Sequence, residues 1–171
     1  MKRLITLLLV LILTSTTAYA IELGDALGGL TEIFGSDDTV TYEVGETGTT
    51  DNVSATLNNV MEGTGNDYGK PADGNVYLYC EFTIENDTSE SLVVSSMMCF
   101  SASCDGVIYG SDVMVTATAI QWGKHQIDGF LEPGKKMTGV VGFEVPKEWK
   151  DLEITYSPDW DSGSLTFVAS R

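Results

Sequence analysis

One stretch of strict alternation constrains this chain more than any other feature. From Val76 to Glu85, every second side chain is aliphatic, a phenylalanine or a thiol, and the side chains between them are tyrosines, a threonine and carboxylates. Successive side chains of a β-strand point to opposite faces of its sheet, so this pattern predicts a half-buried strand. The expected buried face is Val76, Leu78, Cys80, Phe82 and Ile84, and the expected solvent face is Tyr77, Tyr79, Glu81, Thr83 and Glu85.

Shorter apolar segments recur along the chain and are separated by turn residues. In the turn Glu132-Pro133-Gly134, proline presets φ and glycine accepts the positive φ that the following position needs. No segments with helical periodicity connect the strands, which argues against a parallel sheet. We therefore predict an all-β antiparallel sandwich or barrel of about seven to nine strands. The further strands that we expect lie at 39–44, 53–57, 92–100, 107–109, 113–120, 137–145, 152–156 and 165–169.

The first twenty residues have the three parts of a secretory signal peptide. Lys2 and Arg3 precede an apolar run from Leu4 to Leu13, and Ala18-Tyr19-Ala20 supplies a small-x-small ending. A membrane-spanning helix needs about twenty apolar residues, roughly twice the length of this run. We expect cleavage after Ala20, a short helical or flexible lead over 21–38, and one folded domain over 39–171.

The charge of the chain excludes several classes of partner. It has 25 acidic and 9 basic side chains, a formal net charge of −16, and loss of Lys2 and Arg3 with the signal peptide would bring this to −18. Such a surface repels nucleic acid and anionic lipid. Hydrophobic residues make up 43% of the chain, enough for a packed core. We expect a secreted monomer that binds neither nucleic acid nor, after cleavage, a membrane.

Export would allow the three cysteines to oxidise, and an odd number leaves at least one thiol free. Cys99 and Cys104 are close in sequence and could close a small loop. Cys80 could instead pair with either of them across neighbouring strands. All three could also remain small buried hydrophobes without any bond. A zinc site is not expected, because the chain has no C-x-x-C motif and a single histidine, His125.

Four segments in a fixed order carry a family resemblance. They are Asp73-Gly74-Asn75-Val76-Tyr77 with the strand to Asn86, Phe100 to Asp105-Gly106, Leu131-Glu132-Pro133-Gly134 with Gly139, and Phe143-Glu144-Val145-Pro146-Lys147. Over residues 40 to 170 the chain resembles the immunoglobulin-like domain-of-unknown-function family of secreted proteins and lipoproteins from Gram-positive bacteria.

The resemblance implies an immunoglobulin-like β-sandwich and an envelope or extracellular location, and it supplies no catalytic residues. The telomeric-repeat-binding-like label that this family sometimes carries conflicts with the net charge and the signal peptide. No cysteine follows the expected cleavage site, unlike in the lipoprotein members.

Catalytic and metal-binding groups are sparse. His125 with Asp128 is the candidate base and orienting acid of a hydrolase, but no serine stands in a G-x-S-x-G context. Asp159 and Asp161 are the weak candidates for a calcium site, together with the oxygen-rich loops at Asp37-Asp38 and Asn66-Asp67. Calcium needs six to eight oxygen ligands, more than any of these segments supplies. We expect no cofactor and no enzymatic activity.

Aromatic side chains are the remaining candidates for a binding surface. Tyr77 and Tyr79 fall on the expected solvent face of the strongest strand, and Trp122, Trp149 and Trp160 lie in or near loops. Exposed aromatics on a sandwich can bind sugars or proteins. The N-terminal segment, Met97 with Cys99, or the edge of a second sheet could cover the two tyrosines instead. We expect a binding or structural-interaction module of the bacterial cell envelope, with a protein or cell-wall ligand. The alternatives are an envelope-polymer hydrolase and a calcium-stabilised extracellular module.

Overall fold

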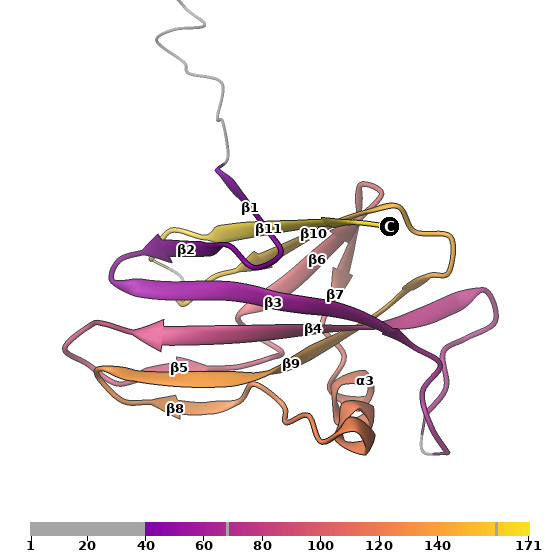
Figure 1. Ribbon diagram of the computed structural model, residues 1–171, viewed down its shortest axis with the longest axis horizontal. Helices are drawn as coiled ribbons and strands as arrows, with labels where there is room; N and C mark the ends of the chain where they lie inside the picture. The colour runs from indigo at the N-terminus through magenta and orange to yellow at the C-terminus, as the bar shows by residue number, and fades with distance from the viewer. Residues whose placement is uncertain (1–39, 68, 160) are drawn as a thin grey trace, which may run out of the picture. The chain divides into compact units, whose positions relative to one another are not determined.

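The alternating segment forms the longest central strand of the molecule, β4 (Asn75–Asn86), which pairs antiparallel on both sides (Figure 1). The computed structural model describes residues 40–67, 69–159 and 161–171. The expected signal peptide and the lead over 21–38 lie outside the described residues. β4 belongs to a four-stranded antiparallel sheet in the order β2-β3-β4-β9. Its other strands are β2 (Thr47–Thr50), β3 (Val53–Gly63) and β9 (Lys135–Pro146).

A five-stranded sheet in the order β1-β11-β10-β6-β7 packs against the first. It is antiparallel except for one parallel pair, β1 with β11. Its strands are β1 (Thr41–Glu43), β6 (Phe100–Cys104), β7 (Val107–Gly110), β10 (Asp151–Tyr156) and β11 (Leu165–Ser170). A two-stranded ribbon of β5 (Leu92–Val94) and β8 (Gly129–Leu131) completes the β-structure described. The fold is a β-sandwich, as predicted, with eleven strands in the described residues instead of the seven to nine expected.

The core lies between the two larger sheets. Phe82 of β4 contacts Phe100 and Phe167 of the opposite sheet, with ring centroids 5.0 and 5.3 Å apart. The predicted inner face of β4 is confirmed, because Val76, Leu78, Cys80, Phe82 and Ile84 are all buried. Full burial of one such large apolar side chain stabilises the fold by about 1.5–3 kcal/mol. The two sheets are therefore held together mainly by this layer of side chains.

The strand predicted over 113–120 is wrong: this segment is helical. It forms the α-helix α3 (Val113–Thr118), followed by the 3-10 helix η1 (Ala119–Trp122). The Asp112 carboxylate caps the helix by accepting hydrogen bonds from the N–H groups of Met114 and Val115. Such a cap satisfies two of the N–H groups that a helix start leaves unpaired. The β-branched composition suggested a strand, but the cap and packing against β4 and β9 outweigh that weak preference.

The strand predicted over 92–100 is also wrong, because it is two strands in different sheets. β5 ends at Val94, a turn occupies 95–99, and β6 begins at Phe100. The segment does not pair with β4, because β3 and β9 already flank that strand. By contrast, the turn predicted at Pro133-Gly134 is confirmed, with φ of 70° at Gly134. Asp105-Gly106 also forms a turn, with φ of 48° and 81°.

No helix in the described part of the chain is long and apolar enough to cross a membrane.

Candidate functional site

The β5–β8 ribbon exposes two large apolar side chains next to each other. Val93 of β5 is paired with Phe130 of β8, so both side chains lie on the same face of the ribbon. They are 60% and 75% exposed. Their neighbours Val94 and Leu131 point the other way and are buried in the core. The ribbon therefore has an anchored inner face and an apolar outer face in solvent.

Asn86, at the end of β4, fixes this ribbon to the sandwich. The side chain is fully buried, and its amide N–H groups donate to the carbonyl oxygens of Glu90 and Leu131, each at 2.8 Å. Its carbonyl oxygen accepts from the backbone N–H and the hydroxyl of Thr88, at 3.0 and 2.7 Å. Leu131 belongs to β8, so the same side chain also joins two segments that are distant in sequence.

The turn after β5 adds two exposed methionines. The Ser96 N–H donates to the Asp128 carboxylate at 2.9 Å, and the Cys99 N–H donates to the Ser95 carbonyl at 2.9 Å. These bonds fix a tight turn whose tip carries Met97 and Met98, 63% and 66% exposed. We call Val93, Met97, Met98 and Phe130 the apolar end patch. Val93 pairs with Phe130 and lines a common hollow with Met98, and gathered exposed apolar side chains of this kind mark interaction surfaces.

A hollow of about 480 Å³ lies beside this patch, between the turn after β5 and the loop from β10 to β11. Val93 and Met98 belong both to the patch and to the wall of the hollow. Four serine side chains and one carboxylate line the rest, which gives the hollow both apolar and hydrogen-bonding walls. We call it the serine pocket; its lining is Val93, Ser95, Met98, Cys99, Ser157, Pro158, Asp159, Ser162 and Ser164.

Asp159 is the charged group of the serine pocket. Its carboxylate accepts hydrogen bonds from the N–H groups of Asp161 and Ser162, at 2.8 and 2.6 Å, and from the Ser162 hydroxyl at 2.8 Å. The hydroxyl bond and the two N–H bonds lower the pKa of Asp159, so the group remains ionised at neutral pH. The pocket therefore presents a fixed negative charge.

The calcium candidates are not brought together with other ligands. The Asp159 oxygens are engaged within their own turn, and Asp161 is exposed. Across the described residues, no three histidine, cysteine, aspartate or glutamate side chains gather in a way that could hold a metal ion. Asn66 and Asp67 lie in a turn in which the Asn66 and Gly69 backbones pair, and Asp37-Asp38 lies outside the described residues.

All three cysteines are free and buried. Cys99 precedes β6 and Cys104 ends it, so five extended steps of about 3.3 Å separate their Cα atoms, well beyond the roughly 7 Å limit for a disulfide. Cys80 lies in the opposite sheet. Burial raises the pKa of each of the three thiols. Cys99 in the serine pocket is consequently a protonated thiol at neutral pH and a poor nucleophile.

His125 and Asp128 do not form a catalytic pair. His125 is exposed, and its backbone carbonyl accepts from the Val140 N–H at 2.8 Å. Asp128 instead accepts from the Ser96 N–H, as described above. The acid expected to orient a base therefore fixes the turn that bears Met97 and Met98.

The two tyrosines of β4 are covered, which was one of the two alternatives from the sequence, but by a different element. Tyr77 and Tyr79 are buried with Val115 and Ala119 of the α3–η1 segment. The Tyr79 hydroxyl bonds to that of Thr118 at 2.6 Å, and the Trp122 ring packs edge-on against Tyr79 with centroids 4.8 Å apart. Desolvation by burial raises the pKa of both tyrosines. The solvent face predicted for β4 is therefore wrong at these two positions.

Trp149 does not offer an exposed binding surface. Trp149 is buried, and its indole N–H donates to the Glu62 carboxylate at 2.7 Å. Trp160 lies outside the described residues.

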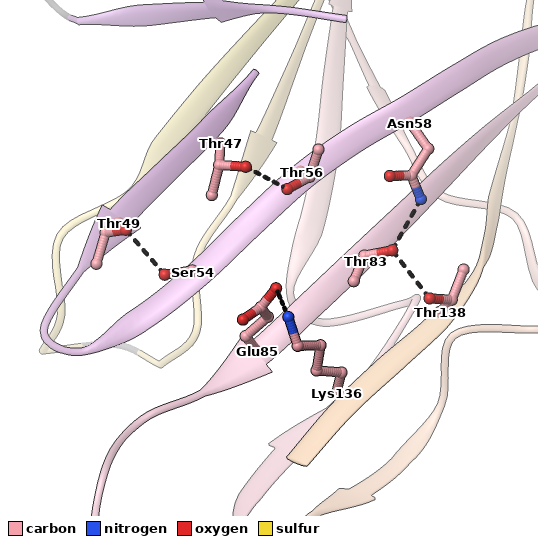
Figure 2. A network of polar contacts seen from close by, with 9 residues as sticks. All are labelled: Thr47, Thr49, Ser54, Thr56, Asn58, Thr83, Glu85, Lys136 and Thr138. Carbon is pink, nitrogen blue, oxygen red and sulfur yellow. Dashed lines mark hydrogen bonds and ion pairs between the residues drawn. The ribbon is translucent and has the colours of Figure 1, made fainter. Parts of the chain in front are cut away.

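The remaining outer face of the four-stranded sheet is a polar network, shown in Figure 2. Cross-strand hydroxyl pairs join Thr47 to Thr56 at 2.7 Å and Thr49 to Ser54 at 2.8 Å. Thr83 on β4 accepts from the Asn58 amide at 2.9 Å and bonds to Thr138 at 2.9 Å. Lys136 forms an ion pair with Glu85. We call the residues drawn there the polar face; they are Thr47, Thr49, Ser54, Thr56, Asn58, Thr83, Glu85, Lys136 and Thr138.

Sequence reasoning missed the apolar end patch. The β8 strand is only three residues long, and the sequence predicts no strand between 120 and 137, so it assigns Phe130 to no face. Met97 and Met98 were placed in a strand, where one of the two should have been buried. An adjacent Met-Met pair cannot satisfy the two-residue period of a half-buried strand, and this was the available indication that the segment turns.

Comparison with known proteins agrees with this architecture. Residues 42–165 match the family described as "Domain of unknown function (DUF4352)". No curated protein sequence matches the chain. The fold is similar to that of the ycdA protein of Bacillus subtilis subsp. subtilis str. 168, described as a "putative lipoprotein", with a TM-score of 0.59 and 18% identity over 72% of this chain. The chain spans 38% of the length of that protein.

Two smaller proteins match over nearly their whole lengths. The yjhA protein of Bacillus subtilis has a TM-score of 0.57 and 18% identity, with 74% of this chain and 99% of that one covered. An uncharacterised β-sandwich protein of Clostridium difficile 630 has a TM-score of 0.51 and 14% identity, with 79% and 98% covered. These likenesses show the fold. The family match spans most of the sequence, and the chain belongs to the DUF4352 family.

Proposed function

We propose that this member of the DUF4352 family is a non-enzymatic, immunoglobulin-like binding module of the bacterial cell envelope. The single observation that carries the proposal is the apolar end patch, four exposed large side chains held on fixed backbone beside a pocket of about 480 Å³. Rigid support matters because a preorganised surface loses less conformational entropy on binding. The anchoring bonds of Asn86 and Asp128 provide that support.

The chemistry of the site favours a protein ligand over a polysaccharide. Methionine side chains adapt to partners of varied shape, and a phenylalanine can act as an anchor in a partner's surface. The serine pocket next to them suits an apolar side chain that ends in a hydrogen-bond donor, and the Asp159 carboxylate favours a positively charged one. The net charge of −16 supports a basic partner through longer-range attraction.

An extracellular location is supported by the sequence of the first twenty residues and by the lipoprotein description of the ycdA relative. A binding role without catalysis is supported by the bond of the Asp128 carboxylate to the Ser96 N–H, in place of a bond to His125, and by the protonated Cys99 thiol. In such a module, affinity resides in the apolar side chains and selectivity in the polar pocket wall.

The proposal can be tested by photocrosslinking in the producing bacterium. A benzoylphenylalanine at position 130 reports on the apolar end patch, and the same group at position 56 is a matched control on the polar face. We expect position 130 to yield a discrete crosslinked envelope protein that position 56 does not yield. Equal products at both positions, or crosslinking of position 130 to cell-wall polymer alone, would contradict a protein-binding patch. Turnover of wall polymer by the purified chain would contradict the non-enzymatic assignment.

A further inference from the structure

The outer edge of β7 presents unpaired backbone groups. β6 and β7 are joined by the two-residue turn Asp105-Gly106, so Cys104 and Val107 form the hydrogen-bonded pair next to it. Bonded and non-bonded pairs alternate in an antiparallel ladder, which places Ile108 and Gly110 at non-bonded positions. Their N–H and C=O groups therefore point away from β6. In the described part of the chain, these outward groups have no hydrogen-bond partner.

Apart from its length of only four residues, this edge lacks the features that usually prevent strand addition. Val107 and Ile108 are 55% and 79% exposed, and β7 contains neither a charged residue nor a proline. Natural edge strands are commonly protected by lysine, proline, bulges or a covering segment. A partner strand would cover the apolar side chains of this edge and pair with its outward backbone groups.

The two edges of the four-stranded sheet differ from the β7 edge. The outer side of β9 is covered by the segment before β8, because the Val140 N–H donates to the His125 carbonyl and the Ile127 N–H donates to that of Val140. The β2 edge is open, but it consists of threonines and one glycine and its hydroxyls bond to β3. β7 thus differs from both edges of the four-stranded sheet.

Charge indicates which strand fits. Asp105 and Asp112 flank β7 in the sequence. Glu153 pairs with Ser103, which in turn pairs with Ile108, so these three side chains lie on the same face of the sheet. A second copy paired antiparallel across this edge would bring Asp105 of one molecule toward Asp112 of the other, with both molecules strongly negative. Both flanking carboxylates already accept backbone hydrogen bonds, Asp112 as the cap of α3 and Asp105 from the N–H groups of Lys150 and Asp151, but each keeps its negative charge. A strand with cationic ends would therefore meet negative charge at both ends and an apolar side chain at Ile108.

We propose that β7 binds an extended, basic segment of another protein as a sixth strand of the five-stranded sheet. Main-chain hydrogen bonds to Ile108 and Gly110 supply affinity, and the flanking carboxylates select for lysine or arginine. This surface is separate from the apolar end patch, since none of its residues lines the serine pocket or belongs to the patch. The two proposals can therefore fail independently.

The test uses the full chain and a fluorescent peptide with two lysines at each end of an alternating valine–threonine centre. We expect binding by fluorescence anisotropy, with new hydrogen-exchange protection of the Ile108 and Gly110 amides. Ile108→Pro removes an outward N–H without breaking a bond to β6 and should weaken binding by at least about tenfold. Thr49→Pro, at the equivalent non-bonded position of the β2 edge, is the matched control and should change affinity by less than about twofold.

Ile108→Lys is the second variant, because it keeps the backbone and repels a basic strand; it should also weaken binding by at least about tenfold. The double variant Val93→Ser/Phe130→Ser should bind the peptide as the unaltered chain does. The proposal is overturned if the peptide does not bind, if a peptide with glutamates in place of the lysines binds equally well, or if both proline variants lose binding equally. A concentration-dependent dimer that Ile108→Pro abolishes would assign the edge to a second copy instead.

Discussion

The polar face and the apolar end patch are both exposed to solvent, but their side chains interact in opposite ways. On the polar face, hydroxyls and an amide bond to one another across three strand boundaries, and Lys136 pairs with Glu85 (Figure 2). At the end patch, large apolar side chains have water as their surroundings while the backbone beneath them is held by buried bonds. The polar face is stable without a ligand, whereas the end patch gains free energy only when something covers it.

At the end patch, the residues that hold the backbone in place are different from the residues that would touch a ligand. The bonds that hold the end patch, those of Asn86 and Asp128, lie beneath or beside it and not on its surface. On the polar face, by contrast, the hydrogen bonds join the exposed side chains themselves and hold no other surface in place. Substitutions should therefore affect stability strongly below the patch, weakly on the polar face, and hardly at all on the patch itself.

The largest effect is expected for Asn86→Ala. The change leaves the buried Leu131 carbonyl and the Glu90 carbonyl without this donor, which should lower the free energy of unfolding by about 2–3 kcal/mol. Urea unfolding followed by circular dichroism measures it. Asn58→Ala is the matched control on the polar face, and we expect less than about 0.5 kcal/mol there because that amide is exposed. Equal losses of unfolding free energy for the two variants would contradict the view that the buried bonds of Asn86 stabilise the fold more than the exposed bonds of the polar face.

A smaller loss of stability is expected where α3 covers the outer face of the four-stranded sheet. The Thr118 hydroxyl donates to the Val115 carbonyl, so the Tyr79 hydroxyl donates to Thr118. Tyr79→Phe removes this one buried bond and leaves the ring packed on Trp122, at an expected cost of about 1 kcal/mol. Thermal unfolding compared with the unaltered chain gives the value. An unchanged unfolding temperature would mean that α3 does not cover β4 in solution.

The polar face should tolerate loss of its central hydroxyl. Thr83→Val removes the bonds to Asn58 and Thr138, but valine suits a strand and water can replace both bonds. We expect a change in the free energy of unfolding below about 0.5 kcal/mol. A loss of more than about 2 kcal/mol would show that the network acts cooperatively and that the polar face carries more of the fold than its exposure indicates.

The serine pocket should show the smallest effect, and one that depends on pH. The pKa of Asp159 lies below its ordinary value of 3.8, so the hydrogen bonds of its turn are complete above that value and are lost as the pH falls through the lowered pKa. The Ser162 amide resonance should report this titration with a midpoint below 3.8. Asp159→Ala should abolish the transition, and a midpoint at or above 3.8 in the unaltered chain would contradict the described turn.

The sequence predicted the sandwich and its inner layer, because those features depend on local alternation and turn chemistry. The inner face of β4 and the turn at Pro133-Gly134 both follow from residues close together in sequence. It could not predict that α3 covers Tyr77 and Tyr79, because covering depends on a segment more than thirty residues away. The pairing of Val93 with Phe130 likewise depends on a contact between distant segments. The candidate site was missed for that reason.

The central claim is that the apolar end patch, and not the polar face, binds the partner. The most direct measurement is the Kd of the protein recovered by crosslinking from position 130, determined for two double variants in parallel. Val93→Ser/Phe130→Ser should raise the Kd by at least about tenfold while leaving the unfolding temperature nearly unchanged. Thr49→Ala/Thr56→Ala should alter the Kd by less than about twofold. The opposite ranking would contradict the account.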